Sequence, residues 1–262
     1  MGKSGKILIL NYHLVANEEI QSRTTSDPFY NVGVETFRAQ MQIINDFNIP
    51  VITLSNLING EFKEEFGIAL TFDDGYTSDI EIVLPILSAL NFSATFFPFL
   101  NCIGQPGRAT WQQLRKLSDL SFEIGSHGVS HTVFSKLSSA DQEKELRFSK
   151  SILEKQLGIT INHFSLPYGW YTNKIIENTK NAGYLSVLTT GLQMNNSENK
   201  PFLLHRWNIK RDTSIDIFRK ILQLKGRLPV HRIFLSFSNR FIRRIFGPVF
   251  TDTLHVLYKK FR

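Results

Sequence analysis

The stretch Thr71-Phe-Asp-Asp-Gly-Tyr76 ends an apolar run that begins at Ile68. Two adjacent carboxylates, Asp73 and Asp74, therefore follow a predicted strand directly and enter a glycine turn. Alone, these residues are also typical of a solvated turn, because Asp and Gly are common there. A second segment, Ser126-His-Gly-Val-Ser-His131, places two histidines four residues apart. Histidine and carboxylate together favour a metal site over a turn.

Apolar, β-rich runs alternate with helical patterns along most of the chain. The predicted strands are Ile7–Tyr12, Ile68–Phe72, Ala94–Phe99, Phe122–Ser126, His163–Leu166, Leu185–Thr189 and Leu203–Asn208. The predicted helices are Val34–Phe47, Ser78–Leu90, Trp111–Asp119, Ala140–Leu157, Asn173–Ala182 and Ser214–Leu224, and the segments Thr110–Gln113 and Ser139–Gln142 are typical of capping boxes. This alternation predicts a mostly parallel sheet. Motifs at the carboxyl ends of strands favour its closure into a barrel, whose loops converge on one site.

The two motifs divide the work of a hydrolytic metal centre. Asp74, His127 and His131 supply three ligands for a divalent ion, and Asp73 remains free to act as a base on water. The histidine pair alone is equally compatible with a helix start that Ser126 caps. With the paired carboxylates upstream, we expect the metal site.

The chain resembles the polysaccharide deacetylases of carbohydrate esterase family 4 over most of its length. The resemblance rests on these motifs, on Ser165-Leu-Pro-Tyr-Gly169 and on the late strand that follows Ala182-Gly-Tyr184. The resemblance implies a distorted, incomplete (β/α) barrel of the polysaccharide deacetylase type. It also implies that water activated by a divalent ion removes N-acetyl groups from an N-acetylated glycan or lipid-linked sugar. Zinc is the expected ion, with Co²⁺, Ni²⁺ or Mn²⁺ as alternatives.

The resemblance also implies groups that handle charge and protons around the ion. The backbone N–H of Tyr168, in a turn preset by Pro167, would stabilise the oxyanion. By its own position directly after this turn, Trp170 either offers a flat face to a sugar or packs in the core. The general acid should be a histidine, but the family's late Leu-x-His motif has no convincing copy here. We expect His13, because the ending Tyr-His of its strand resembles the poly-N-acetylglucosamine deacetylase-like branch; His205, on a late strand, is the alternative.

One position departs from the family pattern. Many relatives carry an arginine where this chain has Ser165, and that arginine pairs with the catalytic aspartate. Arg206 is the candidate substitute at the substrate site, since a guanidinium near Asp73 would keep the carboxyl group ionised. Whether the two side chains meet depends on the fold.

The charge of the chain is concentrated near its end. Of the net +7, the segment from Lys225 to Arg262 carries nine Lys or Arg against one acidic residue, Asp252. We expect a catalytic domain over 1–230 and a basic segment over 231–262. The segment is either a helix docked on the same domain or a peripheral contact with an anionic membrane. A nucleic-acid partner is not expected, because no binding module accompanies the basic residues.

The composition bounds the remaining properties. The single cysteine, Cys102, cannot form an internal disulfide and is expected to be buried. The start of the chain has only four consecutive apolar residues, too few for a signal-peptide core or a membrane span. We therefore expect a cytoplasmic protein, with the basic segment placing it at the inner membrane face.

Two other functions fit the same residues. The first is removal of another small acyl group, such as formyl, from a sugar. The second is glycan binding without turnover, which the departure at Ser165 keeps open. A pure binder has no chemical need for a free carboxylate beside a metal, which argues for catalysis.

Overall fold

The computed structural model describes residues 5–22, 27–196 and 202–223. The basic segment 231–262 lies outside these residues, so its boundary and both interpretations of it stay predictions. In the described part of the chain, no helix is long and apolar enough to cross a membrane.

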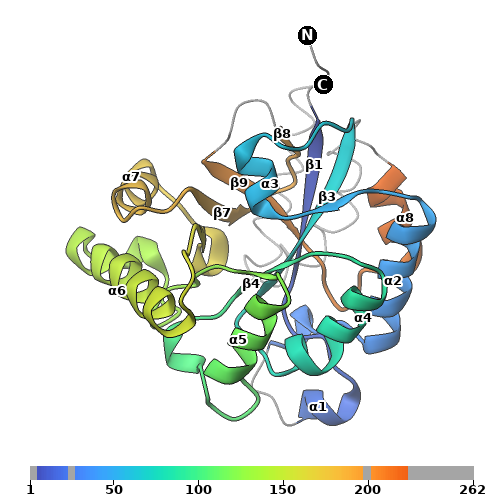
Figure 1. Cartoon of the computed structure of the whole chain (residues 1–262), viewed down its shortest axis with the longest axis horizontal. Helices are drawn as coiled ribbons and strands as arrows, with labels where there is room; N and C mark the ends of the chain where they lie inside the picture. Colours follow the sequence, from blue (N-terminus) through green and yellow to red (C-terminus); the bar gives the residue numbers. More distant parts are fainter. Residues whose placement is uncertain (1–4, 23–26, 197–201, 224–262) are drawn as a thin grey trace, which may run out of the picture. The chain divides into compact units, whose positions relative to one another are not determined.

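The described residues form one mostly parallel sheet with helices around it (Figure 1). The order of the main strands is β5-β4-β3-β1-β9-β7-β6, with β2 paired to β3 and β8 paired antiparallel to β1. The strands are β1 (Lys6–Tyr12), β2 (Val51–Ile52), β3 (Phe66–Asp73), β4 (Thr95–Phe97), β5 (Glu123–Ile124), β6 (His163–Ser165), β7 (Ser186–Thr190), β8 (Asn195–Asn196) and β9 (Leu203–Asn208). The seven predicted strands are confirmed, whereas β2 and β8 were not predicted.

The two outer strands of this order, β5 and β6, approach each other just beyond the end of β5. Ser126 forms a parallel bridge with Phe164: its N–H donates to the carbonyl of His163 at 3.0 Å, and its carbonyl accepts from Ser165 N–H at 2.8 Å. The sheet thus curls into a barrel that one bridge nearly closes. The predicted distorted, incomplete (β/α) barrel is confirmed.

Helices cover the outside of the sheet. They are α1 (Glu18–Ser22), α2 (Val34–Asp46), α3 (Leu54–Asn59), α4 (Leu84–Ala89), α5 (Trp111–Asp119), α6 (Ser139–Leu157), α7 (Asn173–Asn181) and α8 (Ile215–Gln223). Helices α2 and α8 pack together on one side, and α6 and α7 pack together on the other (Figure 1). Thr110 forms the predicted capping box with Gln113, but α6 begins one residue earlier than predicted, after Ser138, whose hydroxyl accepts from Asp141 N–H.

The short helix α3 closes the end of the barrel where the strands begin. Its Leu54 and Leu57 are fully buried and pack against Ile7 and Ile9 of β1. Each such buried leucine contributes about 1.5–3 kcal/mol. The carboxylate of Glu123 accepts the N–H groups of Leu54 and Ser55 at 3.0 Å and so satisfies the exposed donors of the helix start. The two aspartates lie at the opposite end of the barrel, where the strands finish.

Candidate metal centre

The two carboxylates lie where β3 ends and the chain turns away. Asp73 is the last residue of β3, and Asp74 N–H donates to the carbonyl of Phe97 at 3.1 Å. Asp74 and Gly75 both have positive φ, 76° and 62°. A Cβ on Gly75 would lie 2.8 Å from the Pro98 side chain, so only glycine fits this turn. The turn directs adjacent carboxylates into different surroundings.

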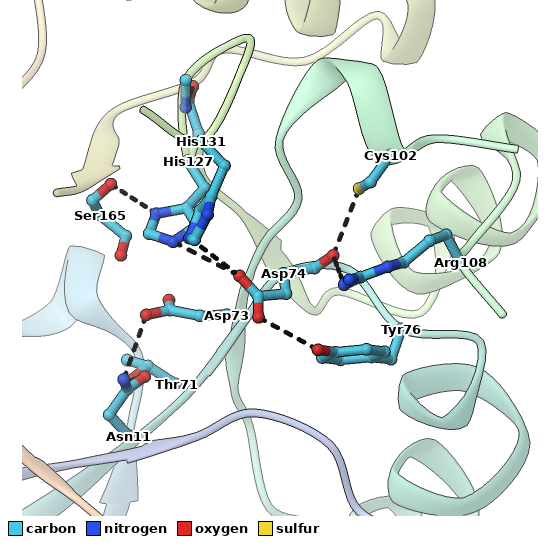
Figure 2. A network of polar contacts seen from close by, with 12 residues as sticks. Asn11, Thr71, Asp73, Asp74, Tyr76, Cys102, Arg108, His127, His131 and Ser165 are labelled. Carbon is cyan, nitrogen blue, oxygen red and sulfur yellow. Dashed lines mark hydrogen bonds and ion pairs between the residues drawn. The ribbon is translucent and has the colours of Figure 1, made fainter. Parts of the chain in front are cut away.

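Asp74, His127 and His131 come together as predicted (Figure 2). The Oδ1 atom of Asp74 is 3.6 Å from His127 Nε2 and 3.4 Å from His131 Nε2. This buried oxygen has no hydrogen-bond partner among the described residues. An ion with bonds of about 2.0–2.1 Å and tetrahedral angles would separate its ligands by roughly 3.3 Å. The separations from Asp74 to the two histidines therefore fit zinc.

The ring of His127 is fixed in the form that binds metal. Its Nδ1 contacts the carbonyl of Ser165 at 2.7 Å, so that nitrogen carries the proton and Nε2 is left as the ligand atom. Burial lowers the pKa of His127 to about 4, although the charge of Asp73 opposes the shift. The ring is therefore neutral at neutral pH, as a metal ligand must be.

The backbone and second oxygen of Asp74 are held from behind. Tyr76 Oη donates to Asp74 Oδ2 at 3.3 Å, while Arg108 Nη1 and Cys102 Sγ donate to its carbonyl at 2.8 and 3.2 Å (Figure 2). Burial raises the pKa of the Cys102 thiol to about 12, so it stays protonated. The prediction that Cys102 is buried is confirmed.

Asp73 faces the barrel interior and pairs with Arg206. The guanidinium of Arg206 donates to both oxygens of Asp73 at 2.8 Å, and Asn11 Nδ2 adds a third hydrogen bond at 3.1 Å. The same guanidinium also donates to Ser165 Oγ at 2.8 Å. Arg206 and Asp73 are each 2% exposed. The side chain that the sequence suggested as a substitute thus lies against both Asp73 and the serine.

Arg206 keeps Asp73 ionised in spite of its burial. Burial by itself would raise the pKa of Asp73, but the charge of Arg206 and its hydrogen bonds lower it well below the ordinary value. Strand pairing brings Arg206 to Asp73. Arg206 lies on β9 between β1 and β7, opposite Ile9 and Thr190.

Of the two candidate acids, the structure brings His13 to this end of the barrel. It follows β1, its ring lies 4.6 Å from that of Tyr30, and its buried Nδ1 has no partner among the described residues. Burial lowers its pKa, while the charges of Asp74 and Asp73 oppose the shift. His205 precedes Arg206 on β9, so its side chain points to the other face of the strand. Only burial lowers its pKa, with no contribution from the site.

The remaining predicted residues form the turn after β6. Pro167 is buried, whereas Tyr168 is 57% exposed, has φ 63° and places its ring 5.0 Å from the ring of His131. Trp170 is 66% exposed. The turn therefore places the Tyr168 ring beside His131 and leaves Trp170 exposed two residues further along.

Sequence analysis named Arg206 but missed the other partners that hold the carboxylates. Asn11 lies on β1 two residues before His13, which follows the strand directly, and this period-two spacing is a signal that could have found it. No local sequence pattern indicates Arg108. It reaches Asp74 because its loop forms a β-bridge with Tyr76, which is distant in sequence.

Comparisons with known proteins point to one family. A family model described as polysaccharide deacetylase matches residues 62–187. YxkH of Bacillus subtilis, which bears the same family name, is 24% identical over 220 residues, covering 82% of this chain and 76% of the relative. The chitooligosaccharide deacetylase of Sinorhizobium fredii is 27% identical over 125 residues, covering 46% of this chain and 55% of the relative.

Solved structures share the fold. A polysaccharide deacetylase from Bacillus cereus gives a TM-score of 0.73 at 22% identity, covering 84% of this chain and 69% of the other. IcaB from Ammonifex degensii gives 0.69 at 17% identity, covering 86% and 98%. The segment matched by the family model contains both aspartates and both site histidines, whereas His13 and Arg206 lie outside it. The family model, the curated relatives and the shared fold together show that the chain belongs to the polysaccharide deacetylase family.

Proposed function

We propose that this protein is a metal-dependent hydrolase that removes N-acetyl groups from an N-acetylated glycan or lipid-linked sugar. The family implies N-deacetylation of a glycan. One observation supports the metal dependence. The buried Oδ1 of Asp74 has no hydrogen-bond partner among the described residues and faces the Nε2 atoms of two histidines. An isolated buried carboxylate oxygen is costly, and a cation is the partner that this donor set fits.

The ion and Asp73 have complementary tasks. A bound divalent ion would polarise the amide oxygen and lower the pKa of a coordinated water from about 15.7 toward about 7. Asp73 would accept the proton from the attacking water. Because Arg206 holds its pKa low, Asp73 is a weak base and can act only on water that is already acidified. The arginine pair and the metal site therefore make chemical sense together.

The leaving amine needs a proton from another group, and we assign this task to His13. Burial lowers the pKa of His13, but the charges of Asp74 and Asp73 oppose that shift and so favour the protonated ring that a general acid needs. His205 is the less favourable acid, because it shares a strand with Arg206 but points to the opposite face.

The turn after β6 would hold the substrate. The backbone N–H of Tyr168, fixed by the positive φ of that residue and by buried Pro167, would donate to the oxyanion. Trp170 is exposed, and its flat apolar ring would stack on the face of a sugar ring. If the basic segment 231–262 contacts an anionic membrane rather than docking on the same domain, the substrate would be a sugar carried at that surface.

Acetate release from N-acetylglucosamine oligomers by metal-stripped protein, with and without zinc, tests the proposal. We expect release only with zinc, and a loss of about 10²–10⁴-fold in Asp73→Asn and in His13→Ala. His205→Ala is the matched control and should stay close to the parent.

Three results would contradict parts of this assignment. Release without any metal would remove the ion from the mechanism. A large loss in His205→Ala with full activity in His13→Ala would exchange the acids. Zinc binding without acetate release, but with formate release from N-formylated sugars, would replace the acyl group.

A further inference from the structure

The loop from His127 to His131 carries two of the three proposed ligands and is held on one side by the segment after β4. The carbonyls of Gly128 and Val129 accept hydrogen bonds from Leu100 N–H and Asn101 N–H, both at 3.0 Å. These bonds fix the loop carbonyls only. The N–H groups of Val129 and Ser130 point to a different partner.

His131 depends on this loop more than His127 does. The ring of His127 is anchored by the carbonyl of Ser165. Among the described residues, no group forms such a hydrogen bond with the ring of His131, which is oriented by contacts with Phe99 and Tyr168 at 5.1 and 5.0 Å between ring centres. His131 also has φ 58°, an uncommon conformation for a residue with a side chain. Its backbone must therefore be held from outside.

Glu145 of α6 provides that hold. Its Oε2 accepts Val129 N–H at 2.6 Å and Ser130 N–H at 3.1 Å, and its Oε1 accepts Ser130 Oγ–H at 2.6 Å. The carboxylate is packed so closely that a Cβ on Gly128 would lie 3.0 Å from Oε2. One side chain from a 19-residue helix thus fixes both N–H groups that immediately precede His131.

We infer that Glu145 is a positioning residue of the metal centre, which sets the place of His131 by binding the backbone of the loop. The inference rests on the proposed metal site but on no step of the chemistry. Metal-ligating histidines ordinarily donate to a carboxylate or carbonyl that orients the ring. Here the carboxylate acts one step further out, through the main chain.

Zinc affinity tests this inference without any substrate. We would measure the dissociation constant of zinc by competition with a chelating dye, using metal-stripped parent, Glu145→Ala and Glu145→Gln. Loss of an outer partner of a ligand typically weakens metal binding 10–100-fold, and we expect this for Glu145→Ala. Glutamine keeps an oxygen for the two N–H groups and an NH₂ that can donate to Ser130 Oγ, so Glu145→Gln should bind zinc nearly as the parent does.

Glu143→Ala is the matched control. It removes the same charge from the same helix, but Glu143 is exposed and pairs with Arg147. Its zinc affinity should equal that of the parent. Thermal unfolding of the metal-free proteins is recorded in parallel, and Glu145→Asp, which keeps the charge on a shorter arm, replaces the alanine variant if that variant fails to fold. It should lose affinity as well.

Each result is decisive. Parent-like zinc affinity in Glu145→Ala or Glu145→Asp would overturn the inference and leave the proposed function standing. Equal losses in Glu145→Gln and Glu145→Ala would show that the negative charge acts through space, which also overturns it. If the parent itself binds no zinc, the proposed metal site fails, and that outcome is recognised before any variant is compared.

Discussion

Arg206 and Asp73 form a fully buried ion pair, whose energetics differ from those of a surface pair. Desolvation of both charges offsets much of their attraction, but removing one partner leaves an uncompensated buried charge. We predict that Arg206→Met lowers the free energy of unfolding by about 3–5 kcal/mol, measured by urea denaturation of metal-stripped protein. Asp73→Asn in the Arg206→Met background should restore part of the loss, because the buried charge is then absent.

The exposed pair of Arg147 and Glu143 is the matched comparison. Both side chains are about half exposed. Arg147→Met should cost less than about 1 kcal/mol, since solvent screens such pairs. Equal losses in Arg147→Met and Arg206→Met would mean that the buried pair does not hold Asp73 in the way described.

At the residue scale, the sequence predicted ligands but not most of their supports. Asp74, His127 and His131 lie in two short motifs, so their grouping needed only the rule that strand ends meet. The contact of Arg206 with Asp73 depends on β9 lying beside β1, a pairing that no local pattern specifies. Glu145 lies on a helix whose rotation about its axis decides whether it reaches the loop.

At the element scale, His163 joins three elements below the site. Its Nδ1 contacts Ser186 Oγ of β7 at 2.9 Å, and its Nε2 contacts Ser55 Oγ of α3 at 3.2 Å. Burial lowers the pKa of His163, although the charge of Glu123 opposes the shift. The folded protein therefore binds this proton more weakly than the unfolded chain, whose histidine pKa is about 6.5.

The sign of the resulting pH dependence follows. Below about pH 6.5 the unfolded chain takes up a proton that folded His163 resists, so stability falls with falling pH until the folded pKa is reached. We predict that His163 contributes up to about 1.4 kcal/mol per pH unit to that slope. Urea denaturation of metal-stripped parent and His163→Gln at several pH values from 5 to 7.5 measures it. An unchanged slope in the variant would show that His163 is protonated equally in both states.

Long elements were predictable because their patterns repeat. The helices corresponding to α2, α5, α6, α7 and α8 show apolar residues at three- and four-residue spacing, and the structure confirms them. The strand β2 has two residues and α3 has six, too few for a period to show. The start of α6 was missed by one residue because adjacent Ser138 and Ser139 offer the same capping hydroxyl.

At the scale of the whole molecule, the proposed ion would link parts of the barrel that are distant in sequence. Asp74 lies at the end of β3, whereas His127 and His131 lie in the loop between β5 and α6. Beside that loop, the bridge between Ser126 and Phe164 is the only one that closes the barrel among the residues that the structure describes. An ion bound there tethers the closing edge to the central strands, so its binding energy should stabilise the barrel as a unit.

We therefore predict that zinc raises the stability of metal-stripped protein by mass action. At a free zinc concentration one hundred times its dissociation constant, the gain is about 2.7 kcal/mol, or roughly 5–10 °C in Tm for a domain of this size. Scanning calorimetry across a zinc series measures it. His131→Ala removes one ligand, so its Tm should rise much less above its own zinc-free value at the same zinc concentration. A zinc-independent Tm in the parent would mean that zinc does not bind the folded protein preferentially, and an equal rise in His131→Ala would place the bound zinc away from these three side chains.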